Sequence, residues 1–265
     1  MTTNTRDSDL SLLQDRLSDI KQQGWIENTS RQGNHGRAGN LLEDLLEVIE
    51  NNLALPDFRS WELKTSTRNA NTALVTLFHN EPEPRAAKIV PNLLRNYGWP
   101  HQEAGAKYPE DEKSFRSTTY ANRFTDRGMR VEVDRDQQKI FFIFEPDLIK
   151  DNQNSWKNQL IASDFYIPFD PVPYWTFDTI QTKLDQKLKN TIMMQVSSKK
   201  ENNKEYFNFQ HFYAYIDPSI EKFLSLLETG GIAIDFDART GHNHGTKFRI
   251  KKNLMLELYE DQLMV

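Results

Sequence analysis

The sequence predicts a mixed α/β (α+β) fold, and two kinds of pattern carry the prediction. Several segments have apolar residues at three- and four-residue spacing, which is typical of amphipathic helices. Between them lie short runs rich in β-branched and aromatic residues, which are typical of strands. Because the two patterns alternate over all 265 residues, we expect a mixed β-sheet flanked by helices.

Helices are predicted where the apolar residues share one face. The first covers 7–23 and ends at Gly24, and a loop is expected from Trp25 to Gly39. Asn40 is expected to cap a second helix, with Glu43 in the capping-box position, and Pro56 to stop it. Further helices are predicted at 177–188, between Asp217-Pro218 and Gly230-Gly231, and at the C-terminus.

Strands are predicted at 60–65, 73–78, 129–133, 140–144, 192–196, 206–216, 232–236 and 246–250. In the first strand Trp61, Leu63 and Thr65 are expected to face one way, and Glu62 and Lys64 the other. The run at 73–78 is the natural partner of that strand. The runs at 129–133 and 140–144 form a hairpin around Asp136, and the last two strands flank a His-rich turn.

The composition excludes several classes of protein. Without Cys there is no disulfide framework or thiolate metal site, and a reducing cytoplasm is the default expectation. Mean hydropathy is −0.72 and no apolar run is long enough to span a bilayer, so no membrane association is expected. The N-terminus has no basic segment followed by an apolar run, so no secretory signal is expected.

The net charge of −5 argues against a nucleic-acid partner, but the distribution of charge argues for one. The segment 115–130 holds four arginines against one acid, and 238–252 holds five basic residues and no acid. Such stretches can bind a phosphate backbone through one face. On charge alone, ordinary solvated surface remains the favoured alternative.

The segment from Pro56 to Lys64 holds the residues best suited to catalysis. Asp57 precedes a predicted strand, and Glu62 and Lys64 follow on one face of it. Two carboxylates there can converge on one Mg²⁺, which prefers oxygen ligands and keeps several waters. Lys64 can orient the attacking water, and Glu43 can supply a third carboxylate. On this pattern alone, a solvent-facing strand with an ion pair two residues apart is the favoured alternative.

The order of several blocks makes the sequence recognisable. Asn40-Leu-Leu-Glu43-Asp, Pro56-Asp57-Phe58, Glu62-Leu-Lys64-Thr65 and Leu77-Phe78-His79 resemble the PD-(D/E)xK nuclease core of the MvaI/BcnI restriction endonucleases. The blocks Tyr174-Trp175-Thr-Phe177-Asp178 and Gly241-His242-Asn-His244-Gly245 through Ile250 resemble the same family. The similarity runs in register from about Ser18 to Leu258. The mismatch-repair nickase MutH shares the helix–strand core.

The resemblance implies a type II restriction endonuclease that makes Mg²⁺-dependent double-strand cuts, with Mn²⁺ as a substitute. Its double-stranded DNA site is expected to be short, GC-rich and pseudopalindromic. A monomer would nick the strands in turn by attack of metal-activated water, in a bacterial or archaeal cytoplasm, with a cognate DNA methyltransferase protecting the host. Residues 1–265 would form one compact nuclease with two lobes. The catalytic lobe would be built around 36–80 with parts of the C-terminal half, and the recognition lobe would include about 205–252.

The resemblance implies that Asp57 and Glu62 are metal ligands and that Lys64 positions the attacking water. It also implies that the Glu43 carboxylate supports the metal site. The expected DNA-binding residues are His79, Asp235, His242, His244 and Arg249 near the bases, Arg116, Arg123, Arg127 and Arg130 at phosphates, and Lys247. The sequence departs from the family pattern in a shorter segment between Phe236 and His242 and in Asp237, where a basic residue is expected. These departures leave the recognised bases open.

Other interpretations remain open. A MutH-like strand-nicking repair endonuclease would share the catalytic residues. A catalytically inactive DNA-binding module would not need the complete set of Asp57, Glu62 and Lys64, and a structural protein without DNA is the last alternative. A zinc site at His242 and His244 with Asp235 is disfavoured because structural zinc usually takes Cys ligands. The aromatic run at 206–215 is read as strand core in preference to base stacking.

Overall fold

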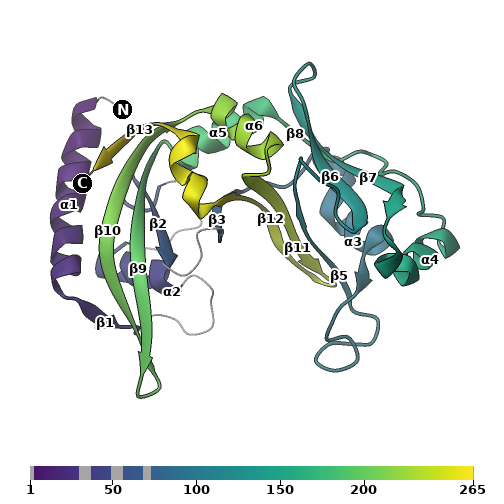
Figure 1. The fold of residues 1–265 in the computed structure, drawn as a ribbon, viewed down its shortest axis with the longest axis horizontal. Coiled ribbons are helices and arrows are strands. Elements are labelled where there is room, and N and C mark those ends of the chain that lie inside the picture. Colours follow the sequence, from purple (N-terminus) through teal and green to yellow (C-terminus); the bar gives the residue numbers. More distant parts are fainter. Residues whose placement is uncertain (1–2, 30–36, 49–55, 68–72, 265) are drawn as a thin grey trace. The chain divides into compact units, whose positions relative to one another are not determined.

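The computed structural model describes residues 3–29, 37–48, 56–67 and 73–264, and these form a mixed α/β protein, as predicted. The chain divides into two compact units (Figure 1). Unit 1 consists of 1–73, 182–219 and 252–265, and unit 2 consists of 74–181 and 220–251. The chain therefore passes between the units at three places besides Ala73.

Unit 1 is built on a five-stranded sheet in the order β1-β10-β9-β2, with β13 also paired to β10. Its strands are β1 (Trp25–Glu27), β2 (Glu62–Thr67), β9 (Asn190–Glu201), β10 (Lys204–Pro218) and β13 (Tyr259–Met264). Only β2 and β9 are parallel among these pairs. The helices α1 (Thr3–Gln22) and α2 (Arg37–Leu45) bury their leucines in one core with the sheet, and a 3₁₀ helix, η3 (Lys252–Leu258), precedes β13.

Unit 2 contains a five-stranded sheet in the order β3-β12-β11-β5-β4 and a three-stranded sheet in the order β6-β7-β8. The first consists of β3 (Leu74–His79), β4 (Trp99–Pro100), β5 (Lys113–Thr119), β11 (Ile232–Arg239) and β12 (His242–Lys251). The second consists of β6 (Arg127–Asp134), β7 (Lys139–Ile149) and β8 (Tyr174–Thr176). The helices of this unit are η1 (Arg85–Ala87), α3 (Ile89–Tyr97), η2 (Asp151–Gln153), α4 (Asn154–Ala162) and α6 (Ile220–Glu228), while α5 (Phe177–Lys187) begins in unit 2 and ends in unit 1.

Aromatic side chains pack the two sheets of unit 2 together. Phe115, Phe142 and Phe236 are fully buried, and the rings of Phe142 and Phe236 have their centroids 4.5 Å apart. Phe248 contacts Trp175 at 5.3 Å in an edge-to-face arrangement. These residues alternate along their strands with polar ones, so the opposite face of β5, β11 and β12 is left for charged side chains.

Several predicted elements are confirmed. They are the first helix, the hairpin of β6 and β7, helices α5 and α6, the long strands β9 and β10, and the pair β11 and β12. The aromatic run at 206–215 contributes to the core as a strand, as predicted, since Phe207 and Phe209 are buried in the core of unit 1.

Four predictions were wrong. The second helix begins at Arg37, so Asn40 lies inside it and is not its cap, because burial of Ala38 and Leu41 extends the apolar face toward the N-terminus. The predicted end of that helix before Pro56 lies outside the described residues. Residues 25–27 form β1 instead of a loop. The predicted C-terminal helix is present as η3, but β13 follows it, so it is not the last element.

The fourth error concerns strand pairing. The run at 73–78 does not pair with β2: β3 pairs with β12, and β2 pairs with β9. Residues 74–80, assigned by prediction to the catalytic lobe, therefore fall in unit 2. Residues 205–219, assigned to the recognition lobe, fall in unit 1, because β10 pairs with β9 from Lys204 to Ile216.

Candidate functional site

A tight turn in unit 1 sets Asp57 beside β2. Phe58 and Trp61 exchange backbone hydrogen bonds of 2.9 and 2.8 Å, which folds the chain back directly after Asp57. Within the turn, the Ser60 hydroxyl donates to the buried Asp9 carboxylate at 2.8 Å. As a result the Leu63 backbone N–H donates to Asp57 Oδ2 at 2.9 Å, and the Asp57 carboxylate lies against the first residues of β2.

Glu62 is buried, with only 4% of its surface exposed. Lys64 Nζ donates to Glu62 Oε1 at 2.6 Å. Burial raises the pKa of Glu62, the ammonium of Lys64 opposes the rise, and the nearby Asp57 carboxylate adds to it. This corrects the interpretation of a solvent-facing ion pair: Trp61 and Glu62, on opposite faces of the strand, are both buried.

The second oxygen of Glu62 is available to a cation. Glu62 Oε2 is buried and accepts no hydrogen bond from the described residues, although Lys187 Nζ lies 3.8 Å away. An unsatisfied buried carboxylate oxygen is costly unless a charge compensates it. Asp57 and Glu62 together offer only hard oxygen donors, so they suit Mg²⁺ completed by water better than a soft metal.

No group of three or more His, Asp or Glu side chains suited to a metal occurs in the part of the chain that the structure describes. Glu43 is therefore not gathered with Asp57 and Glu62 as a third ligand, and its supporting role stays a prediction. The same finding gives no support to a zinc site at His242, His244 and Asp235.

Two residues that sequence reasoning missed lie next to Glu62. Lys187, in the last turn of α5, approaches it as described above, and its signal was only a Lys-rich helix following the Tyr174–Asp178 block. Thr191 lies opposite Glu62 in the β2–β9 register and accepts a 2.8 Å hydrogen bond from the buried Tyr259 hydroxyl. This contact depends on strand pairing and had no local sequence signal.

Unit 2 carries a polar sheet face, which consists of Arg116, Thr118, Asp235, Asp237, Lys247 and Arg249 on β5, β11 and β12. Asp237 binds Arg116 at 3.0 Å and Lys247 at 2.8 Å. Asp235 binds Arg249 at 3.0 Å and accepts from Thr118 at 2.9 Å. Three cations therefore share two carboxylates, which leaves the face with an excess of positive charge and with fixed donors and acceptors.

Histidines lie beside this face. His79 is opposite Lys247 in the β3–β12 register, and the rings of His242 and His244 are 4.1 Å apart. Burial lowers the pKa of His244, and the neighbouring cations act in the same direction, while Asp237 opposes them. Gly245 has φ +85°, and a Cβ there would lie 3.2 Å from the His79 ring, so glycine allows the close approach.

The four arginines predicted at phosphates contact different partners. Only Arg116 belongs to the polar sheet face. Arg123 stacks on Tyr120 at 3.7 Å, Arg130 pairs with Glu132 at 2.6 Å, and Arg127 stacks on Trp99 at 3.9 Å. Their contacts with phosphate, like the base contacts of the residues above, remain predictions.

None of the helices in the described ranges is both long and apolar enough to cross a membrane. Comparison with known proteins identifies the family of the chain.

The sequence model of the MvaI/BcnI restriction endonuclease family matches residues 14–259. No curated protein matches the sequence.

Two solved structures are similar over nearly their whole length. A complex of restriction endonuclease MvaI with its cognate DNA substrate has a TM-score of 0.78 at 27% identity, with 100% of this chain and 99% of that chain covered. Restriction endonuclease MvaI in the absence of DNA has a TM-score of 0.53 at 25% identity, with 100% and 98% covered. With the family model matched from the first helix to β13, the chain belongs to the MvaI/BcnI restriction endonuclease family and is a site-specific deoxyribonuclease.

Proposed function

We propose that the protein is a type II restriction endonuclease that cuts both strands of double-stranded DNA with Mg²⁺, or Mn²⁺, as cofactor. The observation that carries the proposal is the buried Glu62 carboxylate, with one oxygen held by Lys64 and the other without a hydrogen bond, next to Asp57. Asp57 and Glu62 would hold the cation, which when bound polarises a phosphate oxygen and makes water more acidic.

The residues around the cation have separate tasks. The Leu63 N–H fixes the Asp57 carboxylate in place, so that carboxylate needs no rearrangement to serve as a ligand. Lys64 Nζ lies beside Glu62 and can donate both to the attacking water and to a phosphate oxygen that gains negative charge. Glu43 remains a candidate for support of the site from α2.

Base readout is assigned to the polar sheet face with His79, His242 and His244. Arginine and lysine donate to guanine O6 and N7, and aspartate accepts from cytosine N4. A face with Arg116, Lys247 and Arg249 interleaved with Asp235 and Asp237 therefore suits G·C pairs, which supports a GC-rich site. The similar MvaI structure contains that protein's cognate DNA substrate, which supports duplex DNA as the ligand here.

The proposal also covers the oligomeric state, the partner enzyme and the location of the protein. The chain offers one set of Asp57, Glu62 and Lys64, which supports a monomer that nicks the two strands of a pseudopalindromic site in turn. An enzyme that cuts unmodified DNA requires protection of the host's own sites, so we infer a partner DNA methyltransferase and a bacterial or archaeal cytoplasm.

The test is a time course on supercoiled plasmid DNA with Mg²⁺ and with EDTA. We expect nicked circles to appear first and linear DNA to follow, both only with Mg²⁺. Glu62→Gln, which keeps the shape of the side chain, should abolish both products. Accumulation of nicked circles without linear DNA at long times would favour the MutH-like nickase. DNA binding without any product would favour the inactive binding module.

A further inference from the structure

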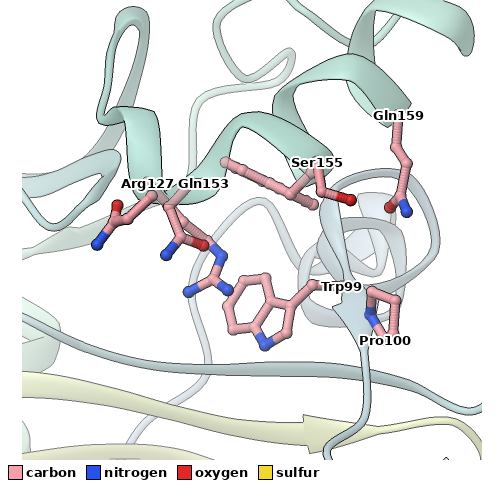
Figure 2. Close-up of a pocket in the computed structure, with 8 residues that line it drawn as sticks. Trp99, Pro100, Arg127, Gln153, Ser155 and Gln159 are labelled. Atoms are coloured by element: carbon pink, nitrogen blue, oxygen red, sulfur yellow. The ribbon is translucent and has the colours of Figure 1, made fainter.

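A pocket of about 190 Å³ in unit 2 contains an arginine with unused hydrogen-bonding capacity (Figure 2). Arg127 stacks on the Trp99 ring at 3.9 Å and lies 5.5 Å from the Trp156 ring centroid. Its Nε is buried without an acceptor. Every other arginine in the described ranges donates a hydrogen bond or forms an ion pair.

Local backbone geometry directs Arg127 into the pocket. The register of β6 and β7 shifts between Arg127 and Met129, which marks a β-bulge. Gly128 occupies the bulge with φ +67°, and a Cβ there would lie 2.3 Å from the Glu145 carbonyl oxygen. Only glycine fits this position, and a bulge re-aims the side chain next to it.

The acidic residue that precedes Arg127 in the sequence, Asp126, is paired with other side chains. Asp126 pairs with Lys150 at 2.7 Å and accepts from Asn152 at 2.8 Å. It contributes only a long-range attraction to Arg127, whose pKa is lowered by burial. A guanidinium carries five N–H donors and stays charged in proteins, so a half-buried one without an acceptor among the described residues is suited to receive an anionic partner.

The other walls of the pocket suit an oxyanion. Gln153 and Ser155 line the pocket and contribute an amide and a hydroxyl group that can donate to an anion. Gln153 and Ser155 also lie at the start of α4, where the helix dipole favours negative charge. The guanidinium fork can donate two parallel N–H···O bonds to a phosphate group, and further donors line the same pocket.

We propose that this pocket binds a phosphate group through Arg127, and that the phosphate is a backbone phosphodiester of the DNA substrate. The site would be separate from base readout, because phosphate contacts position a duplex without reading its sequence. The assignment of DNA as the source rests on the proposed function. A free phosphate-bearing molecule is the other source of the same chemistry.

Two measurements on the full chain test the proposal. The first titrates inorganic phosphate at constant ionic strength and follows tryptophan emission, with Trp99→Phe to identify the reporting ring. The second measures duplex binding in EDTA against salt concentration. Arg127→Met keeps the apolar stem and removes the charge. The matched control is Arg135→Met, an exposed arginine of the same unit that is paired with Glu221 and Glu228.

We expect a saturable emission change in the wild type and in Arg135→Met, and none in Arg127→Met. We also expect Arg127→Met to lower the slope of log affinity against log salt by about 1. An emission change without a change of slope would assign the pocket to a free phosphate compound. A change of slope alone would assign it to the phosphodiester.

The proposal is overturned if folded Arg127→Met matches the wild type in both measurements. In that case unchanged cleavage by the variant would leave the proposed function intact. If Arg127→Met does not fold, Arg127→Lys replaces it. Lysine keeps the positive charge but lacks the planar set of N–H donors of arginine, so we expect at least about a tenfold loss of phosphate affinity. An unchanged affinity would contradict the proposal.

Discussion

Replacement of Lys64 by Met should destabilise the protein by about 3 kcal/mol, because it leaves a buried carboxylate with one partner fewer. Breaking a buried ion pair by removing one member costs about 3–5 kcal/mol. The side chains of Lys64 and Glu62 are 18% and 5% exposed, and they meet at 2.6 Å. Lys187 remains at 3.8 Å and, at equal dielectric, supplies roughly two-thirds of the attraction that Lys64 supplied. We therefore expect the loss of stability to lie at the lower end of that range, about 3 kcal/mol.

Chemical denaturation of Lys64→Met and of Lys199→Met provides the assay. Lys199 pairs with Glu201 at 2.9 Å, but these side chains are 40% and 58% exposed, so its loss should cost less than about 1 kcal/mol. Cleavage by Lys64→Met should fall by at least about 100-fold, with DNA binding largely intact. Equal destabilisation of the two variants, or equal loss of binding and cleavage in Lys64→Met, would refute the reasoning.

The same variant has a predicted pH signature. Burial raises the pKa of Glu62 above its ordinary value of 4.5, although Lys64 opposes the rise. The folded protein then holds a proton at a pH where the unfolded chain has released it, so stability falls as the pH rises through that window. Loss of Lys64 widens the window, so Lys64→Met should lose more stability at neutral pH than near pH 4.5.

Three further predictions concern unit 2. Arg249→Ala should weaken binding to the cognate site by at least about tenfold more than binding to random duplex, and an equal loss in competition assays would remove Arg249 from base readout. Asp237→Asn should lower the pKa of His244 further, since Asp237 raises it in the wild type, and NMR titration of the imidazole measures the change. Phe236→Ala should cost about 3–5 kcal/mol in chemical denaturation because its ring is fully buried between the two sheets, and a cost below about 1 kcal/mol would contradict the described packing.

Local patterns predicted much of the fold. The periodicity of Leu10, Leu13 and Leu17 located α1, and turn chemistry around Asp136 located the hairpin of β6 and β7. These features depend on residues close in sequence. The pairing of β2 with β9 joins residues more than 120 positions apart, and nothing in either strand specified it. Strands adjacent in sequence were assumed to pair, whereas β3 pairs with β12 and β2 with β9.

The catalytic residues, like the elements of the fold, were predictable where they lie close together in the sequence. Asp57, Glu62 and Lys64 lie within eight residues, so their spacing alone indicated a common location. Lys187 and Thr191 reach Glu62 through the pairing of β2 with β9 and the end of α5, so the sequence could not identify them. The interleaved charges of the polar sheet face are also a product of register, because Arg116 meets Asp237 only through the pairing of β5 with β11.

Digestion of a sequenced phage genome, followed by sequencing of the fragment ends, tests the central claim most directly. With Mg²⁺ we expect discrete fragments whose ends share one short, GC-rich, pseudopalindromic motif, with 5′-phosphate and 3′-hydroxyl termini, and no fragments with EDTA. Asp57→Asn should leave the genome intact. Ends without a common motif, or the same fragments in EDTA, would contradict the account of a metal-dependent, site-specific endonuclease.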